Sequence, residues 1–317
     1  MNYIATYFYQ ENIDKGSIYG NIDKNLSDRN LIYWKTVYCL FYTSIINNPN
    51  AHHVLFTNVD DFPYRNELEK LGVIIFDDLQ LSNRNQGKWA TVKFFFDVID
   101  FVCDTEFFKY DDKIMLLDTD CIAINSSDNM FERINSVTPI AAYLNGVEAN
   151  KSSVFHGETL KNLEDIYFES LGLRINIGNK IGGEYFLFLK SGIADFRNKY
   201  KCLLNSNSAS KLITEEQILT MISSETPFCI EHKGIYRIWT TLGYRTIPLD
   251  YNNYSFLHLP SEKEYSLSIL FNECFNAPLL SQVDLKKLVN KITKLNNEPF
   301  LMIKRAVRVI SNKIFNQ

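Results

Sequence analysis

Apolar residues in the first part of the chain follow two periods in turn. Runs rich in β-branched and aromatic residues have the composition of strands, and they cover residues 3–9, 52–58, 73–78 and 113–120. Runs with apolar residues at helical spacing lie between them, at residues 30–46, 64–72 and 88–103. Strands that alternate with helices predict an α/β fold of Rossmann-like type, with a mostly parallel sheet flanked by helices.

The second half of the chain is less regular. Residues 138–145 and 182–190 predict two further strands, the second of which is entered through Gly182 and Gly183. Residues 146–180 are polar and rich in turn formers, with one short amphipathic patch, and predict a long irregular segment. Long segments of this kind are commonly functional, so we expect it to close over bound substrates.

Composition and charge narrow the class of protein. The chain has 317 residues, 46% hydrophobic and 14% aromatic, which is enough for a large core. A formal net charge of -4 gives no global basic field, so we expect no nucleic-acid partner. The six cysteines are scattered and form no CxxC pair, as in proteins with reduced thiols. We see no signal peptide and no apolar run that could span a bilayer, and therefore expect a cytoplasmic protein.

The C-terminal segment differs in charge from the rest. Residues 284–317 hold eight Lys or Arg and two acidic residues, so this tail carries +6, and the remaining 25 basic and 35 acidic residues give -10. One helical face of the tail is apolar and is formed by Ile303, Val307, Ile310 and Ile314. The pattern is typical of peripheral contact with an anionic membrane, such as the inner face of the plasma membrane, and equally of a helix packed on the body. We therefore divide the chain into a domain at 1–283 and a basic amphipathic helical tail at 284–317.

Two carboxylates interrupt the apolar run IMLLDTDCIAI at residues 114–124. They belong to Asp118 and Asp120. An unpaired ionised carboxylate is costly to bury, so this pair should be exposed, paired or bound to a metal ion. In parallel sheets ligands bind beyond the carboxyl ends of the strands, where the pair is expected. Two solvated aspartates without a ligand are the plain alternative.

Three chemistries fit a strand followed by Asp-x-Asp. A nucleotide-hydrolase site needs a GxxxxGK[ST] phosphate loop; the nearest match has Ser82 in place of the first Gly and Trp89 after Lys88, which excludes it. A phosphatase with an aspartate nucleophile remains an alternative, because LLDTDCI resembles the haloacid-dehalogenase motif, although that family usually opens its fold with this strand. In the third, both carboxylates hold Mn²⁺ or Mg²⁺ against a diphosphate.

The order of the segments resembles that of GT-A fold glycosyltransferases, in particular the family of the histo-blood-group A and B enzymes and the α-1,3-galactosyltransferases. The similar segments run in order over residues 3–222 and read IATYFY, VLFTN, KWATVKFFFDVI, LLDTD, IGGEYFLF and TEEQIL. The resemblance implies a metal-dependent hexosyltransferase with a nucleotide-sugar donor, UDP-hexose or UDP-N-acetylhexosamine. The residues expected at the donor are Thr6, Tyr9, Lys88, Lys93, Asp118, Gly182 and Gly183. Together with the basic tail, it suits a glycan or lipid-linked oligosaccharide acceptor in cell-surface polysaccharide biosynthesis.

The sequence departs from that family at two places. The family's Trp-His pair is here Ile213–Thr214, and the Thr of its Gly-Gly-Thr is Glu184, so the acceptor should differ. The pattern is also similar to the glycogenin-like retaining transferases, which carry a late metal-binding His. That similarity implies His258 as a third metal ligand, beside Asp118 and Asp120, with a structural histidine as the alternative.

The remaining candidate residues are carboxylates at the start of a predicted helix at 214–222, where Gln217 completes a capping pattern. The resemblance places Glu216 on the family's catalytic Glu, where it would form a covalent intermediate or stabilise an oxocarbenium-like ion, with retention. Glu215 or Glu184 acting as a base on the acceptor would instead give inversion. Favourable charge at a helix N-terminus is the structural alternative, and an inactive sugar-nucleotide-binding protein is the non-enzymatic one. The sequence makes no prediction of the oligomeric state.

Overall fold

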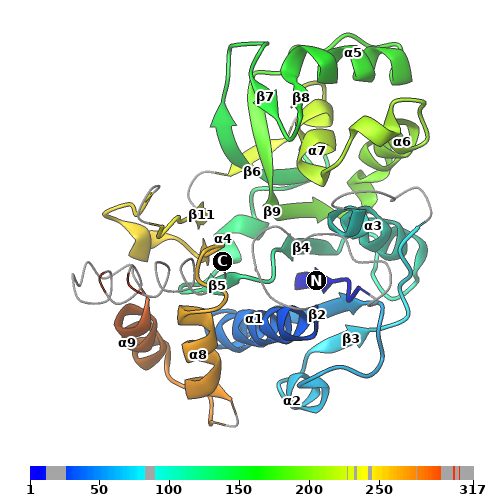
Figure 1. The fold of residues 1–317 in the computed structure, drawn as a ribbon. Coiled ribbons are helices and arrows are strands. Elements are labelled where there is room, and N and C mark those ends of the chain that lie inside the picture. The colour runs from blue at the N-terminus through cyan, green and yellow to red at the C-terminus, as the bar shows by residue number, and fades with distance from the viewer. Residues whose placement is uncertain are drawn as a thin grey trace.

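A seven-stranded, mostly parallel sheet runs through the centre of the molecule (Figure 1). The computed structural model describes residues 1–11, 26–82, 90–226, 228–231, 234–241, 245–275, 277–293, 303 and 307. In sheet order the strands are β10 (Cys229–Glu231), β6 (Ile140–Val147), β9 (Asn179–Leu189), β4 (Lys113–Leu117), β1 (Asn2–Phe8), β2 (His52–Thr57) and β3 (Ile74–Phe76). β9 is antiparallel to β4 and β6, and the other pairs are parallel. The expected fold class is confirmed.

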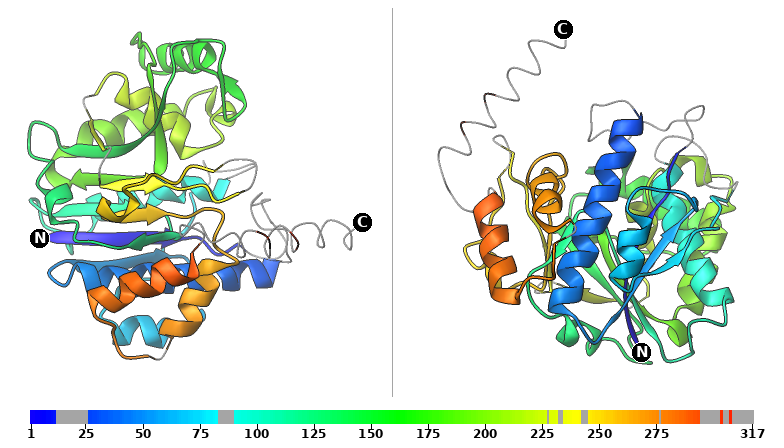
Figure 2. Two further views of the ribbon diagram at one scale, coloured as in Figure 1. Left: turned by 90° about the vertical axis from the view of Figure 1, so that its left-hand side faces the viewer. Right: turned by 90° about the horizontal axis from the view of Figure 1, so that it is seen from below.

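Helices cover both faces of this sheet (Figures 1 and 2). One face carries α3 (Phe94–Asp104), α6 (Ala194–Leu204) and α7 (Glu215–Ser223), with α5 (Leu160–Leu171) against α6 and α7. The other carries α1 (Leu26–Asn47), on which α8 (Ser266–Cys274) and α9 (Gln282–Ile292) pack. Two short helices, α2 (Arg65–Lys70) and α4 (Asp128–Phe131), lie in connections. In α1, Trp34, Tyr38 and Phe41 belong to a buried stripe at helical spacing, which anchors the helix to the core.

A second sheet of three strands branches off directly after β4. Its order is β11 (Ile235–Arg237), β12 (Phe256–His258) and β5 (Cys121–Ala123). The chain leaves β4, turns through residues 118–120 and enters β5, and Cys121 N–H donates to the Asp118 carbonyl at 3.1 Å. The predicted strand at 113–120 therefore ends at Leu117, because the two aspartates form the turn between two sheets.

The segment at 146–180 has regular structure, so the prediction of a long irregular segment was wrong. It contains a hairpin of β7 (Val154–Phe155) and β8 (Glu158–Thr159), followed by α5. The Thr159 side chain accepts a hydrogen bond from Asn162 N–H, and the helix stops at Gly172 with φ 73°. Buried Leu163 and Tyr167 fix α5 on the body. A few apolar residues at helical spacing were therefore enough to form a packed helix in a segment of polar composition.

The two glycines of the expected strand at 182–190 are not at its start. β9 begins at Asn179, so Gly182 and Gly183 lie inside the strand, where its pairing with β6 is irregular. The expected strand entry was wrong because β9 extends further toward its N-terminus than the apolar run that predicted it.

The C-terminal tail is described only in part. α9 begins at Gln282 and buries Leu285 and Val289, so the expected domain boundary after residue 283 falls inside a packed helix. The predicted amphipathic helix lies outside the described residues, except for Ile303 and Val307, which are exposed. Within the described ranges we find no helix that is both long and apolar enough to cross a membrane.

Candidate active site

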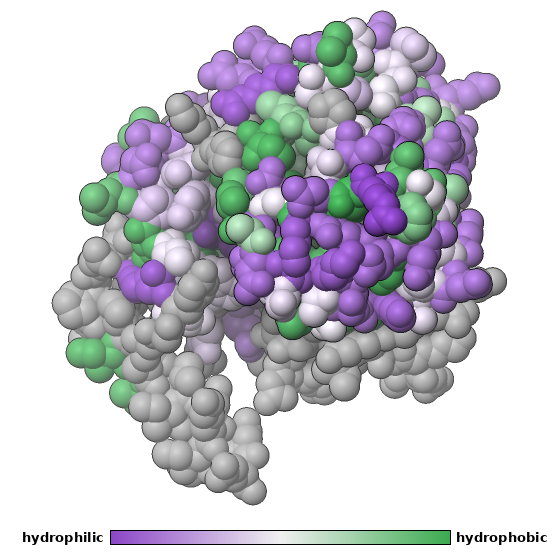
Figure 3. Space-filling model, turned by 90° about the horizontal axis from the view of Figure 1, so that it is seen from above, coloured by the Kyte–Doolittle hydropathy of each residue, from purple (hydrophilic) through white to green (hydrophobic). Residues whose placement is uncertain are grey.

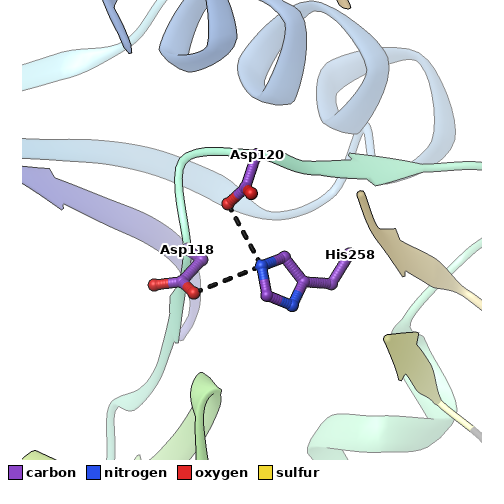
Figure 4. Close-up of side chains that lie close together, drawn as sticks. All are labelled: Asp118, Asp120 and His258. Atoms are coloured by element: carbon purple, nitrogen blue, oxygen red, sulfur yellow. Dashed lines mark ion pairs between the residues drawn. The ribbon is translucent and has the colours of Figure 1, made fainter. Parts of the chain in front are cut away.

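Asp118, Asp120 and His258 converge at the carboxyl end of β4 (Figure 4). Nε2 of His258 lies 3.4 Å from Oδ2 of Asp118 and 3.2 Å from Oδ1 of Asp120. One ligand atom of each residue lies within 4.8 Å of the others, a spacing that no other group of three or more His, Cys, Asp and Glu residues reaches in the described part of the chain. Asp120 and His258 are buried, whereas the Asp118 side chain is 36% exposed, so the group opens to solvent at Asp118.

The topology explains why these residues meet. β12 runs antiparallel to β5 with His258 opposite Cys121, and Leu259 N–H donates to the Asp120 carbonyl at 3.1 Å. The second sheet therefore carries His258 back to the turn that holds the two aspartates. Two carboxylates and an imidazole fit a divalent cation such as Mn²⁺ or Mg²⁺, because carboxylate oxygens are preferred ligands of both ions.

Lys263 is a further member of this group, and the sequence analysis missed it. It is buried, and its Nζ contacts Oδ2 of Asp120. Burial acts to raise the pKa of Asp120, but Lys263 and His258 outweigh it and hold that pKa well below its usual range. Burial acts to lower the pKa of His258, yet Asp120 raises it to about 9. Two cations thus balance the two aspartates; the only sequence signal for Lys263 was its position shortly after His258.

A buried ion-pair network lies behind His258. Glu184 is 0% exposed, and its Oε1 lies 3.6 Å from His258 Nδ1 and 2.6 Å from Arg237 Nε. Its Oε2 accepts a hydrogen bond from Arg237 Nη2 at 2.7 Å. β11 and β12 pair in register, which sets Arg237 beside His258. A carboxylate behind a ligating histidine fixes the orientation of the ring, and Glu184 stands in that place. Nothing in the sequence pattern had indicated Arg237.

A cavity of about 160 Å³ opens beside the two aspartates. Its lining residues are Tyr7, Phe8, Tyr9, Tyr33, Thr91, Val92, Asp118, Thr119, Asp120, Glu215 and Lys263. Aromatic rings form part of the wall, with Phe8 stacked on Tyr33 at 5.2 Å between centroids. Two lining atoms, Thr91 Oγ1 and Glu215 Oε2, are buried and have no hydrogen-bond partner among the described residues. An apolar wall with a few unsatisfied polar atoms is typical of a ligand site.

The first turn of α7 presents two adjacent carboxylates in different surroundings. Gln217 accepts hydrogen bonds from the N–H groups of Ile213 (2.8 Å) and Thr214 (3.2 Å), as the capping pattern predicted. Glu215 faces the cavity, and burial together with Glu216 and Asp118 raises its pKa well above the usual range. Glu216 does not line the cavity in this structure.

Both oxygens of Glu216 are occupied. Oε1 accepts from Arg237 Nη2 at 2.8 Å and from Gly183 N–H at 3.2 Å, and Oε2 lies 2.6 Å from Nε2 of His156. Burial acts to raise the pKa of Glu216, but His156 and Arg237 lower it to about 2. Glu216 is therefore an anion fixed from three directions. Sequence reasoning missed His156 because it lay in the segment expected to be irregular.

The two glycines lie beneath the acidic side chains. A Cβ at Gly182 would come within 2.0 Å of Glu184 Oε2, and one at Gly183 within 2.1 Å of Glu215 Oε1. Any larger residue would displace these carboxylates. The glycines thus affect the site only by leaving room for Glu184 and Glu215, and neither glycine lines the cavity.

Of the other residues expected at the donor, one lines the cavity and two are buried in the core. Tyr9 lines the cavity. Thr6 is fully buried in β1, where its hydroxyl donates to the Leu117 carbonyl at 2.7 Å. Lys93 is buried at the end of a short 3-10 turn before α3, and burial lowers its pKa although Glu215 opposes this. Lys88 lies outside the described residues.

No protein-family model matches the sequence, and no curated protein sequence matches it. Solved structures do. The bifunctional glycosyltransferase WbbM has a TM-score of 0.51 at 8% identity, over 95% of this chain and 51% of that one. Mouse xyloside xylosyltransferase 1 has 0.43 at 13% identity, over 81% and 97% of the two chains. The glycosyltransferase GlyE of Streptococcus pneumoniae TIGR4 has 0.47 at 14% identity, over 86% and 63%.

These structural neighbours are glycosyltransferases, and the likeness to WbbM supports the expected GT-A fold. At such low identity the likeness shows the fold alone. The chain spans about half of WbbM and less than two thirds of GlyE. The narrower resemblance to the blood-group family is not shown by these comparisons and stays a prediction.

Proposed function

We propose that the protein is a metal-dependent glycosyltransferase that transfers a hexose or N-acetylhexosamine from a UDP-sugar, with retention of configuration. The observation that carries the proposal is the group of Asp118, Asp120 and His258, which borders a partly aromatic cavity at the carboxyl ends of the sheet strands. Parallel sheets bind ligands at that edge. The fold likeness to WbbM is consistent with it.

The Asp118, Asp120 and His258 side chains would hold Mn²⁺ or Mg²⁺. A divalent cation bound there supplies charge stabilisation for the departing diphosphate. Lys263 adds a positive charge that lines the same cavity and can pair with a phosphate oxygen. Glu184 we assign to the orientation of His258 rather than to base catalysis, because its side chain is fully buried against Arg237.

The rest of the cavity suits the other parts of the donor. Tyr9 and Tyr33 offer aromatic faces for a nucleobase. Glu215 faces the cavity with a buried unpaired oxygen that can bond a sugar hydroxyl. Glu216, the ionised neighbour, lies outside the cavity lining. Following the resemblance, we place it beneath the anomeric carbon of a bound donor, where a carboxylate forms a glycosyl intermediate or stabilises positive charge.

The acceptor proposal rests on the sequence alone. We infer a glycan or lipid-linked oligosaccharide and peripheral contact with an anionic membrane, because the tail carries +6 by formal charge while the rest carries -10. A basic residue near such a surface contributes about 1 kcal/mol. The protein should therefore sediment with phosphatidylserine vesicles at low salt and be released as salt rises. Failure to sediment at low salt would contradict membrane contact and leave the donor chemistry untouched.

The donor chemistry is tested by calorimetry with a panel of UDP- and GDP-sugars, with and without Mn²⁺. We expect binding and slow hydrolysis of at least one UDP-sugar that both require Mn²⁺. The phosphatase alternative predicts release of phosphate from phosphate monoesters instead, and an inactive binding protein predicts binding without hydrolysis. No Mn²⁺-dependent binding of any nucleotide-sugar would refute the proposed function.

A further inference from the structure

His156 occupies the tip of the β7–β8 hairpin and faces the candidate catalytic carboxylate. Together with Gly157 it forms a two-residue turn with positive φ at both positions, 51° and 92°. Such turns suit the twist of a hairpin, but positive φ is uncommon for a residue other than glycine. Nε2 of His156 lies 2.6 Å from Oε2 of Glu216. We propose that His156 is a positioning residue, which holds Glu216 in place for sugar transfer. The inference rests on the proposed function.

The hairpin is fixed to the first turn of α7, so the contact does not depend on one partly exposed side chain. Nε2 of Gln217 donates to the carbonyl of Phe155 (3.2 Å) and is 3.3 Å from that of His156. Oε1 of the same amide accepts from the N–H groups before α7. Gln217 is fully buried. Glu216 and Gln217 therefore both bind the hairpin, and the imidazole is placed by main-chain contacts.

The partners of Glu216 differ in accessibility. Arg237 and the Gly183 amide, which hold Oε1, are largely buried, whereas the His156 side chain is 35% exposed. The charged or titratable groups around Glu216 are Arg237 from β11, Glu184 from β9, Glu215 from its own helix and His156 from the hairpin. Glu184 and Glu215 disfavour its ionisation by like charge. His156 is therefore one of two side-chain partners that bond Glu216, and the one that solvent reaches more easily.

The face of the molecule that carries α5 is mostly hydrophilic, with hydrophobic side chains in small groups (Figure 3). His156 is assigned no part in bond-making: it contacts Glu216 and no reacting atom. Its loss should act on the turnover number rather than on donor affinity, because Oε2 would lose its hydrogen bond while the metal group and the cavity keep their residues.

Two substitutions separate positioning from hairpin structure. His156→Asn keeps a residue that tolerates positive φ but is too short to reach Oε2. His156→Gln keeps an N–H donor of similar reach that does not titrate. Val154→Ala, in the same hairpin and exposed, is the matched control. Calorimetry with UDP and Mn²⁺ reports the donor site, and kcat and KM are measured with the best UDP-sugar between about pH 5 and pH 8.

We expect His156→Asn to lower kcat by about 10- to 100-fold, as for a lost hydrogen bond to a charged group, with UDP affinity and KM unchanged. His156→Gln should restore most of the rate, and Val154→Ala should match the wild type. Unchanged kcat in His156→Asn, or a loss of rate that His156→Gln does not restore, would overturn the inference. Absence of UDP binding by the wild type would instead refute the proposed function, and the inference with it.

Discussion

The two ends of the candidate site differ in how their carboxylates are paired. At the metal end, formed by Asp118, Asp120, His258 and Lys263, two carboxylates share two side-chain cations and open to a cavity. At the hairpin end, formed by Glu216, His156, Arg237 and Gly183, one carboxylate has both oxygens held by N–H groups. The network from Glu184 to Arg237 joins the two ends.

This difference in pairing indicates a different function for each end. At the metal end a bound ion can take the place of the His258 proton, because the Asp118 side chain is 36% exposed and metal binding releases protons from its ligands. At the hairpin end both oxygens of Glu216 already have partners, which come from a strand amide, an arginine and a docked hairpin. The first end suits reversible binding of a charged ligand, and the second suits a fixed anion.

The largest effect is expected at the metal end. Asp120→Asn removes a ligand and leaves Lys263 without its carboxylate partner, while the amide keeps the size of the side chain. We expect Mn²⁺-dependent hydrolysis of a UDP-sugar to fall by about 1,000-fold, as when a charge-stabilising group is removed. Asp111→Asn, at an exposed position, is the control. A fall of less than tenfold in a folded Asp120→Asn protein would mean that Asp120 does not hold the ion.

An intermediate effect is expected at the junction of the two ends. Glu184→Gln should weaken Mn²⁺ binding by about 10- to 100-fold, as is usual when the partner behind a ligating histidine is lost. Titration calorimetry with MnCl₂ measures this directly. Equal Mn²⁺ affinity in the wild type and the variant would show that Glu184 serves Arg237 alone.

The last pair of effects concerns stability, and they have opposite signs at adjacent residues. The pKa of Glu216 is lowered from 4.5 to about 2, so its contribution is present above pH 4.5 and is lost as pH falls toward 2, and it amounts to about 3 kcal/mol at most. The pKa of Glu215 is raised, so its carboxyl is destabilising to a growing extent as pH rises above 4.5. At pH 7 Glu216→Gln should therefore lower the free energy of unfolding and Glu215→Gln should raise it. Urea denaturation at about pH 4 and pH 7 checks both, and a shift of the same sign in both variants would contradict the difference between the ends.

The metal end could largely be predicted from the sequence, because its key signals are local. Asp118 and Asp120 stand two apart after a strand, and the alternation of strands with helices placed them at the edge where ligands bind. His258 could be predicted as a ligand only from the family resemblance, because it reaches the aspartates through the pairing of β12 with β5. Lys263 carried no distinct pattern.

Most of the hairpin end could not be predicted from the sequence. Glu216 was found by resemblance and by the capping pattern, but its partners come from β9, β11 and the β7–β8 hairpin. Contacts between residues so far apart in sequence leave no periodic signal. His156 was concealed because polar residues around a tight hairpin read as irregular structure. Gly182 and Gly183 were noticed, but the carboxylates packed on them became evident only from the fold.

The most direct test of the account is the anomeric configuration of the sugar released from an α-linked UDP-sugar in the presence of Mn²⁺, followed by proton NMR from the first minutes of the reaction. The account predicts that the α-anomer appears first, that its release requires Mn²⁺, and that Glu216→Gln releases little of it although the protein is folded. First appearance of the β-anomer would show inversion, contradict the role given to Glu216, and direct attention to Glu215, which faces the cavity, as a base.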